Sequence, residues 1–319
     1  MWRPLPLVVL FWAWTAWGFS SPLLPDALLA ARPRSRGPRH ASASYAGRKS
    51  TSPFTMMAVE LKVNDRVCVI GSTGGCGQLI TARLVDEGRY QVKAVGRSEA
   101  KLREVLGGES PKLEFAEADS RDIDSLYGPL SDVDCVIIAT GTSAFPSPRW
   151  RGGNTPDAVD RKGVQNILKA ITSKPRKRTV KKVVFLSSVG VLRTKQLPYS
   201  ILNAFGVLDA KRDSEDLLRQ MAATEGFDIL IVRPGRLVGG PWTNTDVSAL
   251  LKVEEGARKR VVVEQGDSLV GDAARVSVAE LVVRALGRPE AMGRALCVVN
   301  EEGPPFSEGQ WTALFEGLA

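Results

Sequence analysis

A glycine-spaced turn carries the clearest chemistry in this sequence. Gly71, Gly74 and Gly77 follow the short apolar run Val67–Ile70 and precede an amphipathic pattern over Gln78–Glu87. Glycine permits a turn directly off a strand, lets the backbone approach a ligand, and lets the next helix pack closely on the sheet. Because a helix N-terminus attracts anions, the segment predicts a phosphate cradle, with a dinucleotide pyrophosphate as the first candidate. The predicted cradle residues are Gly71, Thr73, Gly74, Gly75, Cys76 and Gly77.

The spacing of this turn is Gly-x-x-Gly-x-x-Gly, which differs from the Gly-x-Gly-x-x-Gly of archetypal dehydrogenases. A glycine triplet by itself also occurs in turns that bind nothing. Its place after the first strand of an alternating pattern favours phosphate binding.

The end of the next predicted strand bears on the choice of dinucleotide. A site that prefers NAD usually has an Asp or Glu here, which accepts hydrogen bonds from the adenosine ribose. This strand ends instead in Arg97 and Ser98, and a guanidinium forms charge-assisted bonds with a 2′-phosphate. We therefore expect NADP(H) to be favoured over NAD(H). The alternative is that Arg97 is an ordinary solvated surface charge.

Small and polar residues also follow the later strands, at the sheet edge where open parallel sheets bind ligands. Those after the third strand are expected near the adenine, those after the fourth along the ribose, and those after the sixth near the nicotinamide. Each pair alone is ordinary loop chemistry, but a candidate after every strand favours one shared ligand. In chain order the residues are Asp119 and Ser120, Thr140 and Gly141, Ser187 and Ser188, and Arg233, Pro234 and Gly235.

Strands and helices alternate along the chain from Leu61, and this alternation must position the candidates above. Parallel neighbours need crossover helices, so the pattern predicts an α/β fold with a doubly wound parallel sheet, in one domain over residues 59–319. The predicted strands are Val67–Ile70, Tyr90–Val95, Leu113–Ala118, Asp134–Thr140, Lys182–Ser187 and Asp228–Val232. The predicted helices are Gln78–Glu87, Ser98–Leu106, Ile123–Leu130, Thr155–Ile171 and Leu208–Ala223.

The C-terminal part is less regular. Its pattern predicts strands at Val261–Glu264 and Ala295–Val299, a helix at Val276–Leu286 and a final helix near Ser307–Leu318. We expect these elements to cap the sheet and to form a small substrate-side lobe.

Residues 1–58 have a composition of their own. The apolar run Leu5–Phe19 is about 15 residues long, which fits the core of a signal peptide better than a membrane span of roughly 20. The following segment, Pro22–Thr55, is rich in Arg, Ser, Ala and Pro and resembles a transit peptide. This order predicts a bipartite targeting leader of the kind found in algae with complex plastids. We expect a plastid protein without a membrane span in the mature chain; the alternative is a short membrane anchor with a basic linker.

The basic charge of the chain belongs mostly to this leader. Residues 1–58 hold seven bases and one acid, a net charge of +6, which leaves +2 of the chain's +8 for the rest. The one local basic run, Lys174–Lys182, is interpreted as a solvated loop. We therefore expect no nucleic-acid partner.

Histidine and cysteine usage excludes several kinds of site. The only histidine, His40, lies in the predicted leader, so the mature chain has no Ser-His-Asp triad and no His-ligated metal. The four cysteines are scattered without metal-ligand spacing or a disulfide framework. We expect no bound metal.

From Val63 to Asn300 the sequence resembles the short-chain dehydrogenase/reductase superfamily, in its atypical NAD(P)H-binding branch of plastids and cyanobacteria. The resemblance implies a Rossmann domain with NADP(H) lying along the strand ends. It is carried by GSTGGCG at Gly71–Gly77, Arg97, NTPDAVDRKGVQNI at Asn154–Ile167, VVFLSSVGV at Val183–Val191, LDAKRDSEDLLR at Leu208–Arg219 and IVRPGRLVGGP at Ile231–Pro241.

One position departs from the superfamily pattern. Active members carry Tyr-x-x-x-Lys on the helix after the fifth strand, where the tyrosine donates a proton as hydride arrives. Here Lys211 is retained, but Val207 stands four residues earlier. Tyr199 lies twelve residues before Lys211 and cannot share its helical face at the required offset, so we interpret it as a loop or core residue. By resemblance, Lys211 binds the nicotinamide ribose and Ser188 occupies the catalytic serine position.

Two functions remain open without this proton donor. The first is a plastid oxidoreductase that reduces an acceptor needing no enzymic acid, such as a quinone or a flavin. The second is a non-catalytic NADP(H) sensor that acts through protein contacts, as the resemblance to factors of chloroplast import and photosystem assembly implies. Aromatic residues in Thr142–Gly153, together with Trp242, could line an acceptor pocket, form a partner surface or simply close the core.

Overall fold

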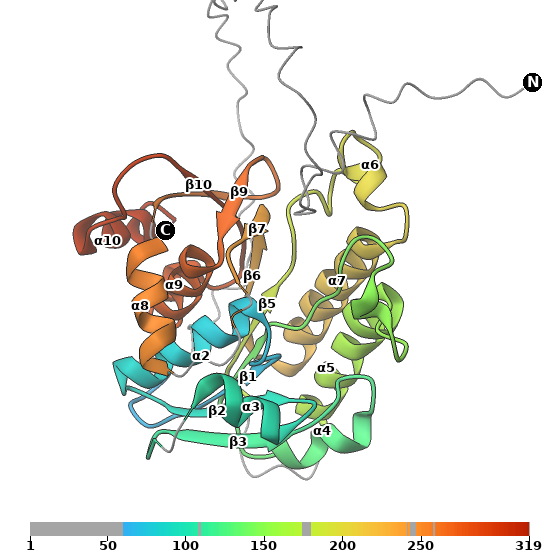
Figure 1. Cartoon of the computed structure of the whole chain (residues 1–319), viewed down its shortest axis with the longest axis vertical. Coiled ribbons are helices and arrows are strands. Elements are labelled where there is room, and N and C mark those ends of the chain that lie inside the picture. The colour runs from blue at the N-terminus through green and yellow to red at the C-terminus, as the bar shows by residue number, and fades with distance from the viewer. Residues whose placement is uncertain are drawn as a thin grey trace, which may run out of the picture. The chain divides into compact units, whose positions relative to one another are not determined.

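The fold rests on a central sheet of eight strands (Figure 1). The computed structural model describes residues 60–107, 110–173, 180–240, 242, 247–257 and 259–318. The predicted leader over residues 1–58, with His40, and most of the basic run after residue 173 lie outside the described residues. Both interpretations therefore stay predictions.

The sheet has the strand order β3-β2-β1-β4-β5-β6-β10-β8. All neighbouring strands are parallel except β8, which runs antiparallel to β10. The strands are β1 (Arg66–Ile70), β2 (Gln91–Gly96), β3 (Leu113–Glu117), β4 (Cys135–Ile138), β5 (Lys182–Leu186), β6 (Asp228–Pro234), β8 (Arg260–Gln265) and β10 (Arg294–Glu301). The strand order reverses at β1 and β4, where a doubly wound sheet opens a crevice for its ligand.

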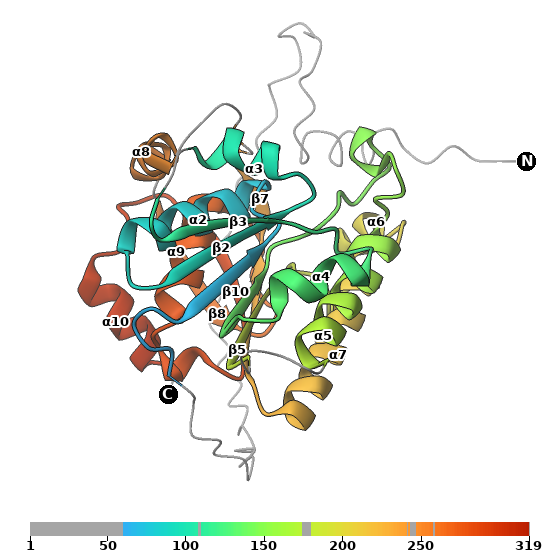
Figure 2. The ribbon, with the colours of Figure 1, turned by 90° about the horizontal axis from the view of Figure 1, so that it is seen from below.

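Helices cover both faces of this sheet, as Figures 1 and 2 show from two directions. On one face lie α2 (Gly75–Glu87), α3 (Glu99–Leu106), α8 (Val247–Ala257), α9 (Arg275–Ala285) and α10 (Glu308–Glu316). On the other lie α4 (Ile123–Leu130), α5 (Val164–Thr172) and α7 (Val207–Glu225). Strand β1 contributes to both cores, because Val67 and Val69 face the first layer while Cys68 and Ile70 face the second. The predicted doubly wound α/β fold is confirmed.

Short elements interrupt several of the connections between strands and helices. A 3-10 turn, η1 (Pro148–Trp150), and a π-helical turn, η2 (Asp157–Gly163), stand between β4 and α5. The predicted long helix Thr155–Ile171 therefore begins as a π-helix, which displaces side chains relative to a regular α-helix. A one-turn helix, α6 (Tyr199–Leu202), precedes α7, and a second 3-10 turn, η3 (Pro289–Ala291), follows α9.

The C-terminal elements differ from expectation in their placement. The predicted strands Val261–Glu264 and Ala295–Val299 form β8 and β10, which extend the main sheet beyond β6 instead of capping it. The smaller unit beside the sheet pairs β7 (Arg236–Val238) with β9 (Asp272–Ala274). Both strands have only three residues, too few for a hydrophobic period, so the sequence pattern missed them. Among the described residues, no helix is long and apolar enough to cross a membrane.

Candidate functional site

The glycine turn between β1 and α2 leaves no room for side chains. A Cβ at Gly71 would lie 3.0 Å from the backbone of Ala139 and Thr140, and Gly71 has a φ of +92°. A Cβ at Gly77 would lie only 2.1 Å from the carbonyl oxygen of Gly71. Gly74 is the N-cap of α2 and has no side chain to bond the first-turn N–H groups, which leaves them for an anion. The geometry is that of a backbone cradle.

The other predicted cradle residues contribute backbone more than side chain. Cys76 is buried in the core, and burial raises the pKa of its thiol to about 11. The carbonyl of Thr73 accepts a hydrogen bond from Gln78 Nε2 at 3.2 Å. The buried Gln78 amide also bonds both the carbonyl and the N–H of Trp242, at 2.9 and 3.1 Å. Sequence reasoning missed Gln78, which ties the cradle helix to the loop after β7.

The loop after β4 places a polar side chain next to this turn. Strand β4 ends at Ile138, two residues before Thr140, so Thr140 and Gly141 lie in the loop next to Gly71. The hydroxyl of Thr140 is buried and has no hydrogen-bond partner among the described residues. A ribose or phosphate oxygen of a bound dinucleotide would satisfy it. The cradle without Cβ atoms and this orphaned hydroxyl together fit the predicted group.

Arg97 and Ser98 lie at the end of β2, as predicted. Arg97 is exposed, and its Nη1 donates to Oδ1 of Asn154 at 2.8 Å. Ser98 is the N-cap of α3, and its hydroxyl accepts from the N–H of Lys101 at 3.3 Å. The guanidinium of Arg97 is therefore held by a neutral amide, whereas the hydroxyl of Ser98 stabilises its own helix.

After β3, Asp119 and Ser120 have different surroundings. Both oxygens of Asp119 accept from Arg121, with Nε to Oδ1 at 3.0 Å and Nη2 to Oδ2 at 2.5 Å. These hydrogen bonds lower the pKa of the Asp119 carboxyl. Ser120 is buried against η2, where a Cβ at Gly163 would meet its hydroxyl at 2.8 Å. Arg121, two residues beyond Asp119, was missed because the carboxylate that holds it had been assigned to the ligand.

Lys211 is buried near the ends of β4 and β5. Its Nζ lies 2.9 Å from Oδ1 of Asp160 and 3.3 Å from the carbonyl oxygen of Leu186. Oδ2 of Asp160 accepts from the backbone N–H of Thr142 at 3.1 Å and from its hydroxyl. A Cβ at Gly141 would lie 3.4 Å from both Asp160 Oδ1 and Lys211 Nζ, so this glycine keeps the approach to the pair open.

Sequence reasoning missed Asp160, although a signal was present. Asp160, Val164 and Ile167 recur at helical spacing, and all three are buried. A carboxylate on an otherwise apolar helix face calls for a buried partner. That partner is Lys211, 51 residues further along the chain.

Val207, four residues before Lys211, lies in apolar surroundings. Val207 is the first residue of α7, one turn before Lys211, and is buried in a cluster with Leu208. Tyr199 belongs to the same buried cluster, and the guanidinium of Arg193 lies 4.5 Å from the centre of its ring. Burial raises the pKa of the Tyr199 hydroxyl. Tyr199 is thus a core residue, as the spacing indicated.

The polar residues predicted to bind a ligand after β5 and β6 make their hydrogen bonds within the protein. The buried Arg233 pairs with Glu215, with Nε to Oε1 at 2.9 Å, and Ser187 donates to the same oxygen at 2.6 Å. Ser187 and Arg233, expected at the ligand-binding edge of the sheet, therefore both bond to Glu215 in the interior. Ser188 is half-buried and donates to the carbonyl of Val189 at 3.0 Å.

Pro234 and Gly235 form the corner between β6 and β7. A Cβ at Gly235 would lie 2.2 Å from the carbonyl oxygen of Gly271, just before β9. The glycine is therefore required by strand packing whether or not a ligand approaches. The corner still lies at the carboxyl end of β6, on the edge where the cradle lies.

Three aromatic rings contact one another near the start of α7. Phe145 and Trp150 each meet Phe205 edge to face, with ring centroids 6.1 and 5.8 Å apart. Phe205 is half exposed and lies two residues before Val207. Trp242 is held near α2 by Gln78 and is not among these contacts. The structure thus brings together part of the predicted aromatic set.

These features define a doubly wound α/β domain with a glycine turn before α2 and a buried lysine at its carboxyl edge. Residues 71–289 match a family described as NAD(P)H-binding, and the chain belongs to that family. No curated protein matches the sequence.

Solved structures share the fold at low sequence identity. The oxidoreductase ylbE from Lactococcus lactis superposes with a TM-score of 0.58 at 17% identity, over 79% of this chain and 96% of its own. A candidate NAD-dependent epimerase/dehydratase from Bacillus halodurans has a TM-score of 0.57 at 23% identity, over 76% and 96%. A short-chain dehydrogenase/reductase from Veillonella parvula in complex with NADP has a TM-score of 0.52 at 14% identity, over 76% and 97%. The expected NAD(P)H-binding Rossmann fold is confirmed, and the plastid branch stays a prediction.

Proposed function

We propose that this protein is an NADP(H)-dependent oxidoreductase that passes hydride to an acceptor requiring no enzymic acid, such as a quinone or a flavin. The observation that carries the proposal is the pairing of a retained, buried Lys211 with an apolar Val207 on one turn of α7. The site can hold the nicotinamide ribose but offers no side-chain acid at the superfamily position.

The charges at the end of β2 support NADP(H) over NAD(H). Arg97 points a guanidinium at the loop where the adenosine ribose would lie, and Arg121 stands nearby against Asp119. A 2′-phosphate would accept charge-assisted hydrogen bonds from Arg97. No carboxylate at the end of β2 competes for the ribose hydroxyls.

Each group in the site has a defined task. Lys211, held by Asp160, would bond the ribose hydroxyls and orient the ring. A bound NADPH supplies the hydride. A quinone that accepts this hydride becomes a hydroquinone anion and takes its proton from water, so the missing tyrosine is not needed. The rings of Phe145, Trp150 and Phe205 would contact the flat acceptor.

The experiment is a screen for NADPH oxidation by the purified chain with a panel of quinones and flavins. Steady turnover with one of them supports the oxidoreductase, and Lys211→Met should reduce it at least tenfold. Lys169→Met, which removes an exposed lysine on α5, is the matched control and should leave turnover unchanged. NADPH binding without turnover across the panel would contradict the proposal and favour the sensor.

The leader supports a plastid location as a further proposal. A fluorescent protein fused behind residues 1–58 should enter the plastid of an alga with complex plastids. The same fusion without residues 1–20 should stay outside the organelle, because the signal-like core is removed.

A further inference from the structure

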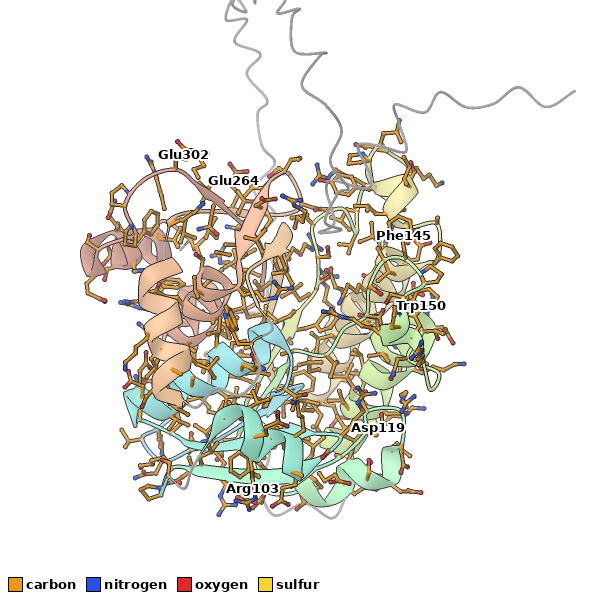
Figure 3. The ribbon with its side chains drawn as sticks, in the orientation of Figure 1. Arg103, Asp119, Phe145, Trp150, Glu264 and Glu302 are labelled. Carbon is orange, nitrogen blue, oxygen red and sulfur yellow. The ribbon has the colours of Figure 1, made fainter. Side chains whose placement is uncertain are left out.

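The loop that follows β4 runs from the acceptor side of the site to the adenosine side. We call residues 142–154 the strap. Figure 3 shows Phe145 and Trp150 of the strap above Asp119, which follows β3. The strap therefore spans the edge along which the dinucleotide is expected to lie.

Two arginines hold the adenosine end of the strap. Arg97 donates to the Asn154 side chain at 2.8 Å, and Arg121 donates to the carbonyl oxygen of Gly152. A Cβ at Gly153 would lie 3.6 Å from Arg121 Nη1. Asn154 and Gly152 thus bond to the two arginines, Arg97 and Arg121, that would attract a 2′-phosphate.

The acceptor end is held by a different set of contacts. Thr142 bonds to Asp160 through its N–H and its hydroxyl, and Asp160 pairs with Lys211. Between the two ends, Trp150 packs edge to face on Phe205, and its indole N–H donates to the carbonyl of Ser143 at 3.2 Å. The strap therefore links the arginines to the three aromatic rings near the start of α7.

We infer that Asn154 competes with the cofactor's 2′-phosphate for Arg97. NADP(H), but not NAD(H), therefore releases the strap and gives the acceptor access to the rings of Phe145, Trp150 and Phe205. A phosphate bonds a guanidinium more strongly than a neutral amide does, because both partners are charged. NADH has hydroxyls at this position and leaves the Arg97–Asn154 bond in place. The inference rests on the proposed NADP(H) preference and adds an order of events: the phosphate binds first, and the acceptor enters afterwards.

The groups around Arg97 determine which of its contacts a 2′-phosphate would replace. Asp119 lies close enough to Arg97 for the positive charge to help lower the pKa of its carboxyl, after the larger effect of Arg121. Because Asp119 is already bonded by Arg121, the weaker amide of Asn154 is the contact that a phosphate displaces from Arg97. Asn154 is thus a specificity-determining residue.

Two substitutions at position 154 test the competition in opposite directions. Asn154→Ala removes the competitor, so NADPH should bind about twofold to tenfold more tightly while NADH affinity is unchanged. Asn154→Asp pairs a charge with Arg97 and should weaken NADPH binding about tenfold or more. Titration of the full chain measures both. Weaker NADPH binding by Asn154→Ala would overturn the inference, because Asn154 would then be supporting the phosphate.

Hydrogen exchange in the full chain tests release of the strap. The N–H groups of Trp150 and Asn154 bond to carbonyls at 2.9 and 3.1 Å within the strap and should exchange slowly. Saturating NADPH should speed exchange in peptides covering residues 146–155 several-fold relative to saturating NADH, while α10 serves as the unchanged control. Equal exchange with the two cofactors would overturn the inference.

The outcomes of these experiments distinguish the competition at Arg97 from the proposed oxidoreductase function on which it rests. Equal affinity of the unmodified chain for NADPH and NADH would contradict the proposed NADP(H) preference and the inference together. A preference for NADPH with no response at Asn154 or in the strap would overturn the inference alone. Absence of turnover with every acceptor would contradict the oxidoreductase but leave the competition at Arg97 intact.

Discussion

At the scale of single residues, the buried charge of Lys211 is balanced by a carboxylate. In the superfamily pattern, the lysine works beside a tyrosine one turn earlier, whereas here Val207 fills that place. Asp160 approaches from η2 and holds the ammonium 2.9 Å away. The lysine and a buried counter-charge are therefore both present, whereas the residue one turn earlier on α7 carries no acidic proton.

The first prediction concerns Arg97. Arg97→Asp removes a charge-assisted bond to the 2′-phosphate and adds repulsion, so NADPH affinity should fall by about 1.5–3 kcal/mol, roughly tenfold to a hundredfold. NADH affinity should hold or improve, because a carboxylate can accept from ribose hydroxyls. Fluorescence titration measures both constants, and Lys101→Asp on the neighbouring α3 is the control. Unchanged NADPH binding would sink the assignment.

The second prediction concerns the partner of Lys211. Asp160→Asn leaves the buried ammonium without its counter-charge and should lower the free energy of unfolding by about 3–5 kcal/mol. Asp157→Asn, in the same π-helical turn, disturbs an exposed pair with Arg161 and should cost less than about 1 kcal/mol. Urea unfolding measures the difference. Similar losses in both variants would show that Asp160 is not a buried charge partner.

At the scale of elements, the turn and α2 act as one unit. Gly74 is the N-cap of α2 and Gly77 lies in its first turn, and the helix can begin this close to β1 because Gly77 has no Cβ to meet the carbonyl oxygen of Gly71. The same closeness brings the N-terminus of α2 beside β1, which pairs with β4. The packing of α2 and the proposed binding of an anion therefore depend on the same glycines.

The third prediction follows from this dependence. Gly77→Ala would place a Cβ 2.1 Å from the Gly71 carbonyl oxygen, so the helix must shift, at a cost of about 1–3 kcal/mol, and dinucleotide binding should be lost. Gly309→Ala in the exposed α10 meets no atom within 4 Å and should stabilise by about 0.5–1 kcal/mol. Thermal unfolding and NADPH titration compare the two. Normal NADPH binding by Gly77→Ala would contradict the cradle.

At the scale of the whole molecule, one buried charge network joins the sheet to α7. Glu215 on α7 accepts from Ser187 after β5 and from Arg233 on β6, and all three residues are buried. Burial alone would raise the pKa of Glu215, but the hydrogen bonds from Arg233 and Ser187 outweigh it and hold the pKa below its usual value. This network couples global stability to pH.

The fourth prediction is the sign of that coupling. The pKa of Glu215 is lower in the folded chain than in the unfolded chain. The ionised carboxylate therefore adds to the free energy of unfolding above the unfolded pKa of about 4.3, and this contribution is lost as pH falls through the folded pKa. Urea unfolding from pH 7 to 3 should show a shallower acid decline for Glu215→Gln than for the unmodified chain. Glu104→Gln, on the exposed side of α3, should keep the original slope. Identical slopes in all three chains would contradict the prediction.

Much of the fold could be predicted because its signals are local. The apolar run before Gly71 and the amphipathic pattern after Gly77 specify a strand, a turn and a helix without reference to the rest of the chain. The three-residue strands β7 and β9 could not be predicted, because no period fits in three residues and their partner is distant. Strand β8 was predicted at Val261–Glu264, but its antiparallel place beyond β10 could not be, because it depends on tertiary packing.

By itself, the sequence determined the glycine turn, the strand-end positions of Arg97 and Thr140, and the apolar residue Val207 four positions before Lys211, because each depends on spacing within one element. Only the tertiary structure decided which side chains meet. Arg97 and Asn154 are 57 residues apart along the chain and touch at 2.8 Å, and Asp160 reaches Lys211 across two crossover connections. Local patterns fix where an element ends, but such pairings form only when the sheet brings distant ends together.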